Sequence, residues 1–344
     1  MRRVTIRDVA DRAGVSLKSV SRVVNHEANV SAKLRARVEA AITSLGYVPD
    51  TAARSLAGAR FGARSFAIAC LFDNPSPNYT IKVQQGVYAA CREHGYHLLI
   101  ESIDCQAEDV EAQMNAILQN ARIDGMILTP PTTEHEMVMN MLEARGIPIV
   151  RIAPVSFAGR TPAVIIDDAA AAGEVARHFR ALGHSHFGII NGPIEHGAAG
   201  TRRTGFIEAL GRADCAEATG GFLFAGGIEA AYKLLRRDAR PTAIFATNDD
   251  MAAGVYAAAN KLGLKVPQDV SVIGFDDSWT ATCVWPGLTT IYQPITEMAH
   301  EAARLLIMRE SPREDVVMAY HLVERASTAP PALAARGPVG VRTL

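Results

Sequence analysis

Residues 17–22 place two cationic side chains and a hydroxyl on the outward face of an expected helix. Lys18 and Arg22 are four residues apart, and Ser21 lies on the same side, next to Arg22. Lys and Arg can donate hydrogen bonds to O6 and N7 of guanine, and a good pairing discriminates by about 1–3 kcal/mol. Leu17 suits a thymine methyl or a sugar edge. We therefore expect this face to read base edges in a DNA major groove.

Two short helices are expected to position these side chains. Gly14 supplies the turn between them, and Ser16 is placed to cap the second helix. Apolar residues with helical spacing form the inward faces: Ile6, Val9, Ala10 and Ala13 in the first helix, and Val20, Val23 and Val24 in the second. This arrangement predicts a helix-turn-helix. The alternative is an ordinary helical pair whose basic residues only solvate a surface.

The charge distribution favours the DNA-binding interpretation. Residues 1–60 contain 11 Lys/Arg and 5 Asp/Glu, a net charge of +6, whereas the whole chain of 344 residues has a net charge of −1. The five cysteines are scattered and form no C-x-x-C pair, which predicts neither a disulfide framework nor a zinc site. We found no secretory signal and no membrane span, so we expect a cytoplasmic protein without a membrane partner.

A short segment after the expected head has the composition of a conditional helix. Asp50 can cap residues 51–57, and Gly58 can end the helix. So few residues are too short for a stable isolated helix in water, because helices below about 12–15 residues are marginal. We expect this segment to fold only against a partner.

The remaining sequence alternates short apolar runs with amphipathic stretches. In the first set the expected strands are 66–71, 97–100, 125–128 and 147–150; in the second set they are 163–166, 186–190, 243–246 and 271–275. Short runs that are apolar on both faces, separated by helices, predict doubly wound parallel sheets. The fold class is therefore an all-α head with a hinge helix, followed by an α/β body of two lobes. The cleft between the lobes is the expected site for a small molecule.

These patterns define the expected domains. We assign 1–48 to the helix-turn-helix domain, 49–60 to the hinge, 61–326 to the effector-binding and dimerisation domain, and 327–344 to a disordered tail. Within the body, the first lobe comprises about 61–160 plus 292–326, and the second comprises 161–291. Residues 288–294 are expected to cross between the lobes before a last helix at about 295–310.

The head also resembles a known family. The matching segments are V-T-I-R-D-V-A from Val4, A-G-V-S from Ala13, V-S-R-V-V-N from Val20, V-S-A-K from Val30, G-Y-V-P from Gly46 and A-R-S-L-A-G from Ala53. They closely resemble the lactose-repressor (LacI/GalR) family of bacterial transcription regulators, and the likeness extends over about residues 3–325. The resemblance implies a periplasmic-binding-protein-like body and a homodimer, sometimes a tetramer, on a near-palindromic operator.

The same resemblance implies further DNA contacts. In the family, paired hinge helices enter the minor groove and a leucine opens a base step, which matches Leu56 here, with Ala53 beside it. The alternative for Leu56 is a core leucine. The complete expected set of DNA-binding residues is Thr5, Ser16, Leu17, Lys18, Ser21, Arg22, Asn25, Ser31, Ala53 and Leu56.

The resemblance also assigns residues to an effector pocket. The expected contacts are Asn78, Tyr79, Thr80, Arg202, Phe222, Asn248 and Asp276. Arg202 fits the family pattern R-x-x-G-[FYW] better than Arg203, and its planar group suits hydroxyls or a carboxylate. Phe224 is an alternative to Phe222. A pair of aspartates at 276 and 277 is often only a helix cap, which is the interpretation we favour for Asp277.

One position departs from the sugar-binding members of the family. They often have an aspartate after the strand that ends at Val150, whereas this chain has Ala153, with Arg151 nearby. An oligosaccharide, a glycoside or an anionic effector would each be compatible with this change, as would an Arg151 that points into solvent.

Together these features predict a ligand-responsive, sequence-specific DNA-binding regulator, a repressor of a carbohydrate-utilisation operon, without catalytic residues, metal or cofactor. The sequence leaves open whether the effector induces or co-represses. A solute-binding protein would use the same cleft but would require a secretory signal. An enzyme would require a nucleophile–base motif, a phosphate loop or a metal cluster, and His184 and His186 do not have convincing metal-ligand spacing.

Overall fold

The structure is a computed structural model that describes residues 4–24, 30–47 and 64–332. Contacts divide the chain into two compact units, Met1–Phe66 and Ala67–Leu344. Each unit has its own core, so the two are described separately.

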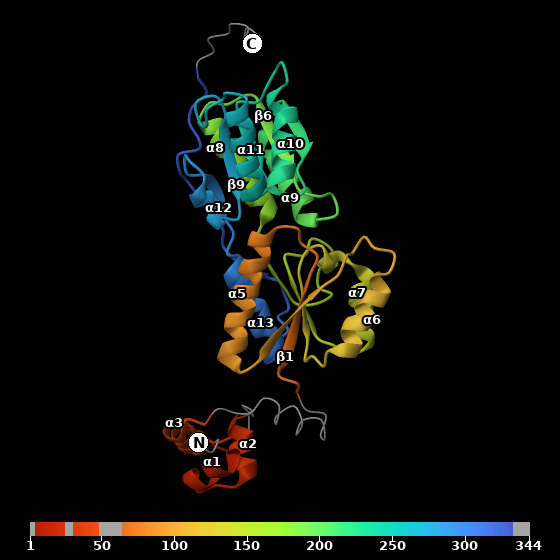
Figure 1. The fold of residues 1–344 in the computed structure, drawn as a ribbon, viewed down its shortest axis with the longest axis vertical. Coiled ribbons are helices and arrows are strands. Elements are labelled where there is room, and N and C mark those ends of the chain that lie inside the picture. Colours follow the sequence, from red (N-terminus) through yellow and green to blue (C-terminus); the bar gives the residue numbers. More distant parts are fainter. Residues whose placement is uncertain (1–3, 25–29, 48–63, 333–344) are drawn as a thin grey trace. The chain divides into compact units, whose positions relative to one another are not determined.

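The described residues of the first unit contain three helices, α1 (Ile6–Ala13), α2 (Leu17–Val24) and α3 (Ala32–Leu45) (Figure 1). Gly14 connects α1 to α2 with φ at 58°, a left-handed conformation that favours glycine. Arg37 of α3 donates a hydrogen bond of 2.9 Å to the Gly14 carbonyl, which fixes this turn. The buried core consists of Val9, Ala10, Ala13, Val20, Val23, Val38 and Ala41. The predicted helix-turn-helix is therefore present.

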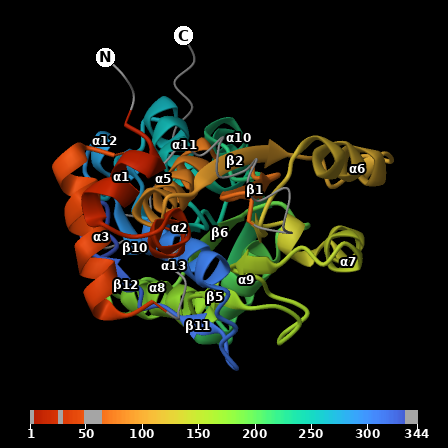
Figure 2. The ribbon, with the colours of Figure 1, turned by 90° about the horizontal axis from the view of Figure 1, so that it is seen from below.

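The second unit begins with a six-stranded sheet of order β11-β5-β4-β3-β1-β2, in which every pairing is parallel. Its strands are β1 (Ala67–Phe72), β2 (His97–Ser102), β3 (Met126–Leu128), β4 (Ile149–Ile152), β5 (Ala163–Ile165) and β11 (Val316–Val317). Its helices are α5 (Pro77–His94), α6 (Val110–Asn120), α7 (Glu136–Ala144) and α13 (Ile295–Met308), with the short helix η1 (Thr132–Glu134). Helices α5 and α13 lie on one side of the sheet, and α6 and α7 lie on the other (Figures 1 and 2). We call this half the first lobe.

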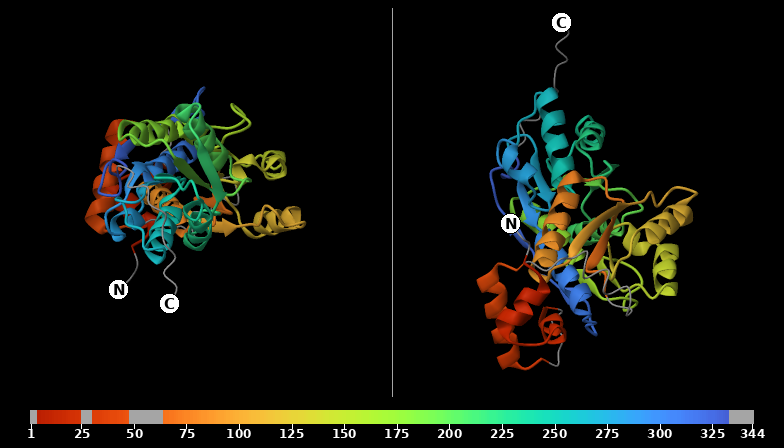
Figure 3. Two further views of the ribbon diagram at one scale, coloured as in Figure 1. Left: turned by 90° about the horizontal axis from the view of Figure 1, so that it is seen from above. Right: turned by 60° about the horizontal axis from the view of Figure 1, so that its bottom comes forward.

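The second lobe repeats this architecture. Its sheet has the order β12-β10-β9-β8-β6-β7, and only β12 is antiparallel to its neighbour. Its strands are β6 (Phe187–Asn191), β7 (Cys215–Thr219), β8 (Ala243–Ala246), β9 (Ser271–Phe275), β10 (Thr289–Tyr292) and β12 (His321–Val323). Its helices are α8 (Asp168–Ala181), α9 (Gly197–Leu210), α10 (Phe224–Leu235), α11 (Asp249–Lys261) and α12 (Trp279–Cys283). Helix α8 lies across the sheet from α10 and α11, as the view from above shows (Figure 3).

The chain crosses between the lobes three times, and the predicted boundaries need correction. Strand β5 belongs to the first sheet, although we expected residues 163–166 to open the second lobe. Residues 289–292 form β10 of the second sheet, so the crossing begins only at Gln293. Strand β12 returns to the second lobe, although we assigned 292–326 entirely to the first. The sequence of a short strand does not indicate which sheet it joins, so only the observed pairing assigns β5, β10 and β12 to their lobes.

The predicted tail also begins too early. Ser327 is fully buried, accepts a hydrogen bond of 2.7 Å from the Thr289 amide, and donates one of 2.6 Å to the Val272 carbonyl. The Ala329 amide donates to the Ser271 hydroxyl at 3.0 Å. Residues 327–329 are therefore part of the second lobe, because backbone pairing compensates for their small side chains; residues 333–344 lie outside the described ranges.

Candidate functional site

The face of α2 that we expect to read DNA is exposed on the first unit. Lys18 is exposed, Leu17 is 42% exposed although it is apolar, and Ser21 and Arg22 are half-buried. The opposite face of α2 contributes Val20 and Val23 to the core. A recognition helix needs both faces: the exposed face enters the major groove, and the opposite face packs against the core of the domain.

Three of the predicted DNA contacts also cap helices. The Thr5 hydroxyl accepts from the Asp8 amide at 3.4 Å, the Ser16 hydroxyl from the Ser19 amide at 3.2 Å, and the Ser31 hydroxyl from the Leu34 amide at 3.3 Å. The predicted cap at Ser16 is confirmed. The Thr5 hydroxyl also donates to the Asp8 carboxylate at 2.7 Å, and the Ser16 hydroxyl lies 3.0 Å from the Ser19 hydroxyl. Phosphate contacts by these three residues stay predictions. Asn25, Ala53 and Leu56 lie outside the described residues.

A narrow cavity of about 30 Å³ lies between the two lobes of the second unit. Five of the predicted effector contacts line it: Tyr79, Arg202, Phe222, Asn248 and Asp276. They come from α5, from α9, and from the carboxyl ends of strands in the second sheet. This is the edge at which parallel α/β sheets bind ligands.

Arg202 is the electrostatic centre of this inner cavity. Its guanidinium donates 2.6 Å to Asp168, 2.8 Å to the Thr247 carbonyl and 3.0 Å to the Gln293 side chain. It also lies over the Phe275 ring, 3.6 Å from the ring centroid. These contacts fix the plane of the group, so its remaining N–H donors have a defined direction.

Asp276 is a buried carboxylate with few partners. Its Oδ1 lies 3.7 Å from Arg202, and among residues 64–332 no donor reaches either carboxylate oxygen within hydrogen-bond distance. Burial raises the pKa of Asp276 to about 7, although the nearby Arg202 and Lys82 lower it. A buried acceptor of this kind is costly unless a ligand donates to it.

Tyr79 supplies a second unsatisfied group. Its ring is buried, its hydroxyl makes no hydrogen bond with any described residue, and burial followed by the Asp276 charge raises its pKa. A phenol donates one hydrogen bond and accepts others. Tyr79 and Asp276 together therefore offer a donor and an acceptor to a polar ligand.

Phe222 forms the apolar wall of the inner cavity. Its ring packs on Gly192, where any Cβ would overlap it, and the His196 ring meets it edge-on at 5.4 Å. The Asn248 amide nitrogen donates 3.0 Å to the Phe222 carbonyl, and its oxygen accepts from Met251 at the start of α11. Asn248 therefore holds the wall in place, while the alternative aromatic residue, Phe224, is 49% exposed.

Two predicted contacts do not line the inner cavity. Asn78 donates across the cleft to Asp250 at 2.6 Å and to Thr280 at 3.1 Å, and the Thr80 hydroxyl donates to the Ser76 carbonyl at 3.1 Å. Consecutive residues on a helix point about 100° apart, so Tyr79 and its two neighbours cannot all face one pocket. Asn78 nevertheless faces the cleft and Thr80 lines a neighbouring cavity, so effector contacts by these two residues stay predictions.

Other residues at the cleft edge join the two lobes. The Lys82 ammonium donates to the carbonyls of Asp276 and Asp277, both at 2.9 Å, and Ser76 donates to Asp250 at 3.1 Å. Asp277 does not cap a helix as we favoured; its carboxylate pairs with Arg325 at 2.7 Å. Arg203, the competitor of Arg202, pairs with Glu217 away from the cavity.

Arg151 neither enters the cavity nor points into solvent. It is fully buried and donates to the Thr161 hydroxyl at 2.9 Å and to the carbonyls of Ser156 and Phe157, both at 2.7 Å. Its role is to fix the loop that follows β4. Ala153 does line the inner cavity. The argument for an anionic effector based on Arg151 therefore has no support.

Several further lining residues were missed. They are Asn74, Ser76, Pro130, His196, Ala198 and Gln293. Asn74 and Ser76 lie just before the predicted contact Asn78 in the sequence, and Gln293 lies in the segment 288–294 that we expected to cross between the lobes. No motif of the sequence pointed to His196. Within the described ranges no three acidic, histidine or cysteine side chains gather to hold a metal ion.

The comparisons with known proteins agree with this division into head and body. Residues 5–50 match the bacterial regulatory proteins of the lacI family, and residues 176–328 match a periplasmic binding protein-like domain. The chain is 36% identical over 314 residues to the ribose operon repressor of Escherichia coli (strain K12), covering 89% of this chain and 92% of that repressor. It is 34% identical over 335 residues to the HTH-type transcriptional repressor PurR of Serratia proteamaculans (strain 568), covering 94% and 97%.

Solved structures of transcriptional regulators are also similar to this chain. The lac repressor dimer bound to operator and the anti-inducer ONPF has a TM-score of 0.71 and 28% identity, covering 95% of this chain and all of that chain. The complex of the transcriptional regulator CelR with cellobiose has a TM-score of 0.70 and 28% identity, covering 94% and 100%.

A helix-turn-helix head joined to a two-lobed body with a polar interlobe cavity defines a ligand-responsive, DNA-binding transcriptional regulator. The chain belongs to the lacI family of bacterial regulatory proteins. The similar proteins are transcriptional regulators, not enzymes or solute-binding proteins. None of the helices in the described ranges is both long and apolar enough to cross a membrane.

Proposed function

We propose that the protein represses a carbohydrate-utilisation operon and that a neutral sugar in the inner cavity controls its affinity for the operator. The observation that carries the proposal is that the unpartnered Tyr79 hydroxyl of the first lobe and the Asp276 carboxylate of the second lobe, whose nearest cation is Arg202 at 3.7 Å, line the same cavity. Hydroxyl groups both donate and accept, so a polyol satisfies both residues at once. The Phe222 ring offers an apolar face to the sugar ring.

The charge around the inner cavity favours a neutral effector over an anionic one. Asp168 and Asp276 flank the single guanidinium of Arg202, and Asp168 already holds it at 2.6 Å. The net charge of these three side chains is zero or negative, so a ligand carboxylate or phosphate would gain no favourable electrostatic energy there. The name of the ribose operon repressor and the cellobiose bound to CelR point to the same ligand class.

Effector binding must change the distance between the lobes. A sugar ring needs far more space than about 30 Å³, and the cleft is held by Lys82, Asn78 and Ser76 contacts to the second lobe. A ligand shifts a conformational equilibrium by its differential affinity for the two states. The sugar therefore acts by stabilising a more open arrangement than the one described.

DNA reading is assigned to Leu17, Lys18, Ser21 and Arg22, with Thr5, Ser16 and Ser31 near phosphates. Asn25 and the hinge, residues 49–60, with Ala53 and Leu56, complete the proposed set of DNA contacts. Two copies of the chain are needed to read a near-palindromic operator.

A homodimer is the assembly that we propose. The second lobe exposes Trp285 by 90% and Trp279 by 69%, and α5 exposes Ile81 and Tyr88 on one face. Large exposed apolar groups of this kind mark protein interfaces. Light scattering on wild type and Trp285→Ala tests the assembly: we expect a dimer that the substitution weakens.

Fluorescence anisotropy with the DNA upstream of the protein's own gene tests the function. We expect a sequence-selective complex whose affinity falls steeply with salt, because several phosphates are contacted. A neutral sugar should change that affinity, and its acidic counterpart should not. Binding that ignores sequence, or an acidic sugar as the sole effector, would contradict the proposal.

A further inference from the structure

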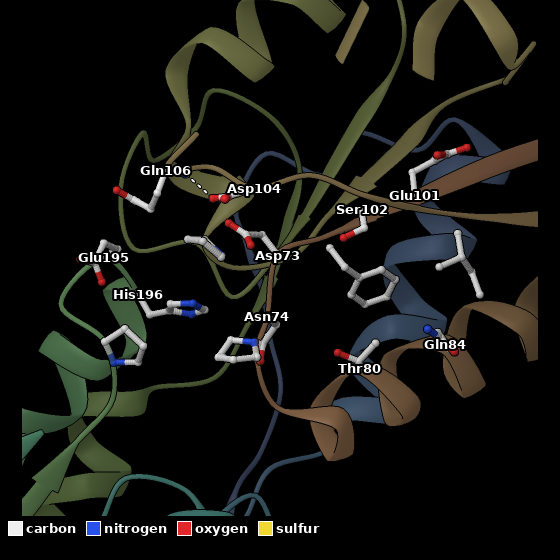
Figure 4. Close-up of a pocket in the computed structure, with 15 residues that line it drawn as sticks. Asp73, Asn74, Thr80, Gln84, Glu101, Ser102, Asp104, Gln106, Glu195 and His196 are labelled. Carbon is white, nitrogen blue, oxygen red and sulfur yellow. Dashed lines mark hydrogen bonds between the residues drawn. The ribbon is translucent and has the colours of Figure 1, made fainter. Parts of the chain in front are cut away.

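A second, larger cavity adjoins the inner one. It has a volume of about 480 Å³ and shares Asn74 and His196 with the inner cavity. The ends of β1 and β2 form one side, and the loop between β6 and α9 forms the other (Figure 4). We call it the outer cavity. Its volume lies within the range of about 300–1,000 Å³ that is typical of small-molecule sites.

The lining of the outer cavity combines acceptors with apolar faces. Asp73, Asp104 and Glu195 contribute carboxylates, and Phe72, Pro131 and Pro193 contribute apolar surface. Neither Lys nor Arg is among the described residues that line it. Carboxylates accept from hydroxyl groups and repel anions, and apolar faces pack against the C–H faces of a sugar ring.

His196 lies where the two cavities meet. Its side chain is only 4% exposed, and its ring makes no hydrogen bond with any residue in the described ranges. In Figure 4 the ring points from the β6–α9 loop towards Asn74 at the end of β1. Burial lowers the pKa of His196, although the charges of Asp73 and Glu195 raise it. The burial therefore favours the neutral ring, which has one hydrogen-bond donor and one acceptor. The ring nitrogens of His196 are therefore able to bond to a ligand at the junction of the two cavities.

We propose that the outer cavity is a second subsite for a neutral glycosyl unit, so that the effector is a disaccharide or glycoside with His196 between its two parts. This inference rests on the proposed sugar response of the inner cavity. The effector then spans both lobes, since β1 and β2 belong to the first and the β6–α9 loop belongs to the second.

Isothermal titration of the full-length protein with matched sugars tests the subsite. The pairs are glucose with cellobiose, galactose with lactose, and xylose with xylobiose. We expect at least one disaccharide to bind ten-fold or more tightly than its monosaccharide. Tight binding of a monosaccharide together with weaker binding of its disaccharide overturns the subsite but leaves the proposed function intact. Absence of binding by all six sugars overturns the proposed function, and the subsite with it.

Two substitutions test whether the disaccharide preference arises in the outer cavity. Gln106→Trp and Ser102→Trp place bulk in the outer cavity from exposed positions that do not line the inner one. Each should erase the disaccharide preference while the monosaccharide affinity stays within two-fold of wild type. Gln119→Trp, an exposed position on α6, is the matched control and should change neither affinity. Equal losses for both sugars in the cavity variants, or an unchanged preference, count against the subsite.

Discussion

Replacing Asp276 with asparagine should stabilise the folded protein at pH 8 and stabilise it less than half as much at pH 5. Burial raises the pKa of this carboxyl from its ordinary 3.8 to about 7. At about 1.36 kcal/mol per pH unit, ionising it in the folded state is disfavoured by about 4 kcal/mol relative to the unfolded chain. Asn has nearly the same shape and tolerates the positive φ of 108° at this position.

The sign follows from proton binding. Between pH 4 and 7 the folded protein holds a proton on Asp276 that the unfolded chain has released, so stability falls as the pH rises through this range. Asp249, whose pKa burial and the Asp276 charge raise to about 8, adds to the same trend. Because the two carboxyls interact, the gain expected from Asp276→Asn at pH 8 is about 2 kcal/mol rather than the full 4.

Urea denaturation followed by tryptophan fluorescence measures this gain directly. The chain has two tryptophans, Trp279 and Trp285, and both lie in the second lobe close in sequence to Asp276. The matched control is Asp277→Asn, which breaks the partly exposed pair with Arg325 and should give no gain at either pH. Equal stability of wild type and Asp276→Asn at pH 8, or the same gain at pH 5, would refute the reasoning.

Three further substitutions test other parts of the structure. Lys18→Ala should relax operator preference at one base pair per half-site by about ten-fold, measured by anisotropy on single-base variants; an equal loss on every sequence would make Lys18 a phosphate contact. Arg151→Met should lower the free energy of unfolding by about 3 kcal/mol, because several buried carbonyls lose their donor, whereas Arg160→Met, at a more exposed ion pair, should cost less than about 1 kcal/mol in the same urea titration. Lys82→Met removes two hydrogen bonds across the cleft and should favour the open state, raising sugar affinity several-fold by titration; a loss of affinity would show that the ligand binds the closed cleft instead.

The sequence predicted the fold class because apolar runs and helical spacing are local signals. The helix-turn-helix was predicted down to the Ser16 cap. Strand β7 and helix α10 were missed, since Cys215–Thr219 includes a glutamate and threonine and α10 follows a glycine-rich stretch. The lobe to which residues 163–165 belong depends on pairing with distant strands, which no local pattern reports.

The inner cavity was predicted only in part for a similar reason. Asp276 follows the end of β9 and Arg202 lies within α9, and the family's motif spacing predicted both residues. Asn78 lies within one residue of Tyr79, yet it points to a different surface, because helix rotation decides what each residue faces. Arg151 has the charge of a ligand contact, and only its fully buried hydrogen bonds show that it holds a loop.

The hydrogen bond from Arg202 to the Gln293 side chain links the ligand cavity to a segment that connects the two lobes. Gln293 lines the inner cavity. It also lies in the segment that connects β10 to α13, which is one of the three crossings of the chain between the lobes. A ligand hydroxyl that accepts the hydrogen bond from Arg202 would release Gln293, a residue of the crossing segment between β10 and α13. In a genetic screen, substitutions at Gln293 should therefore alter effector affinity and operator release together, and they should not separate into binding-defective and response-defective classes.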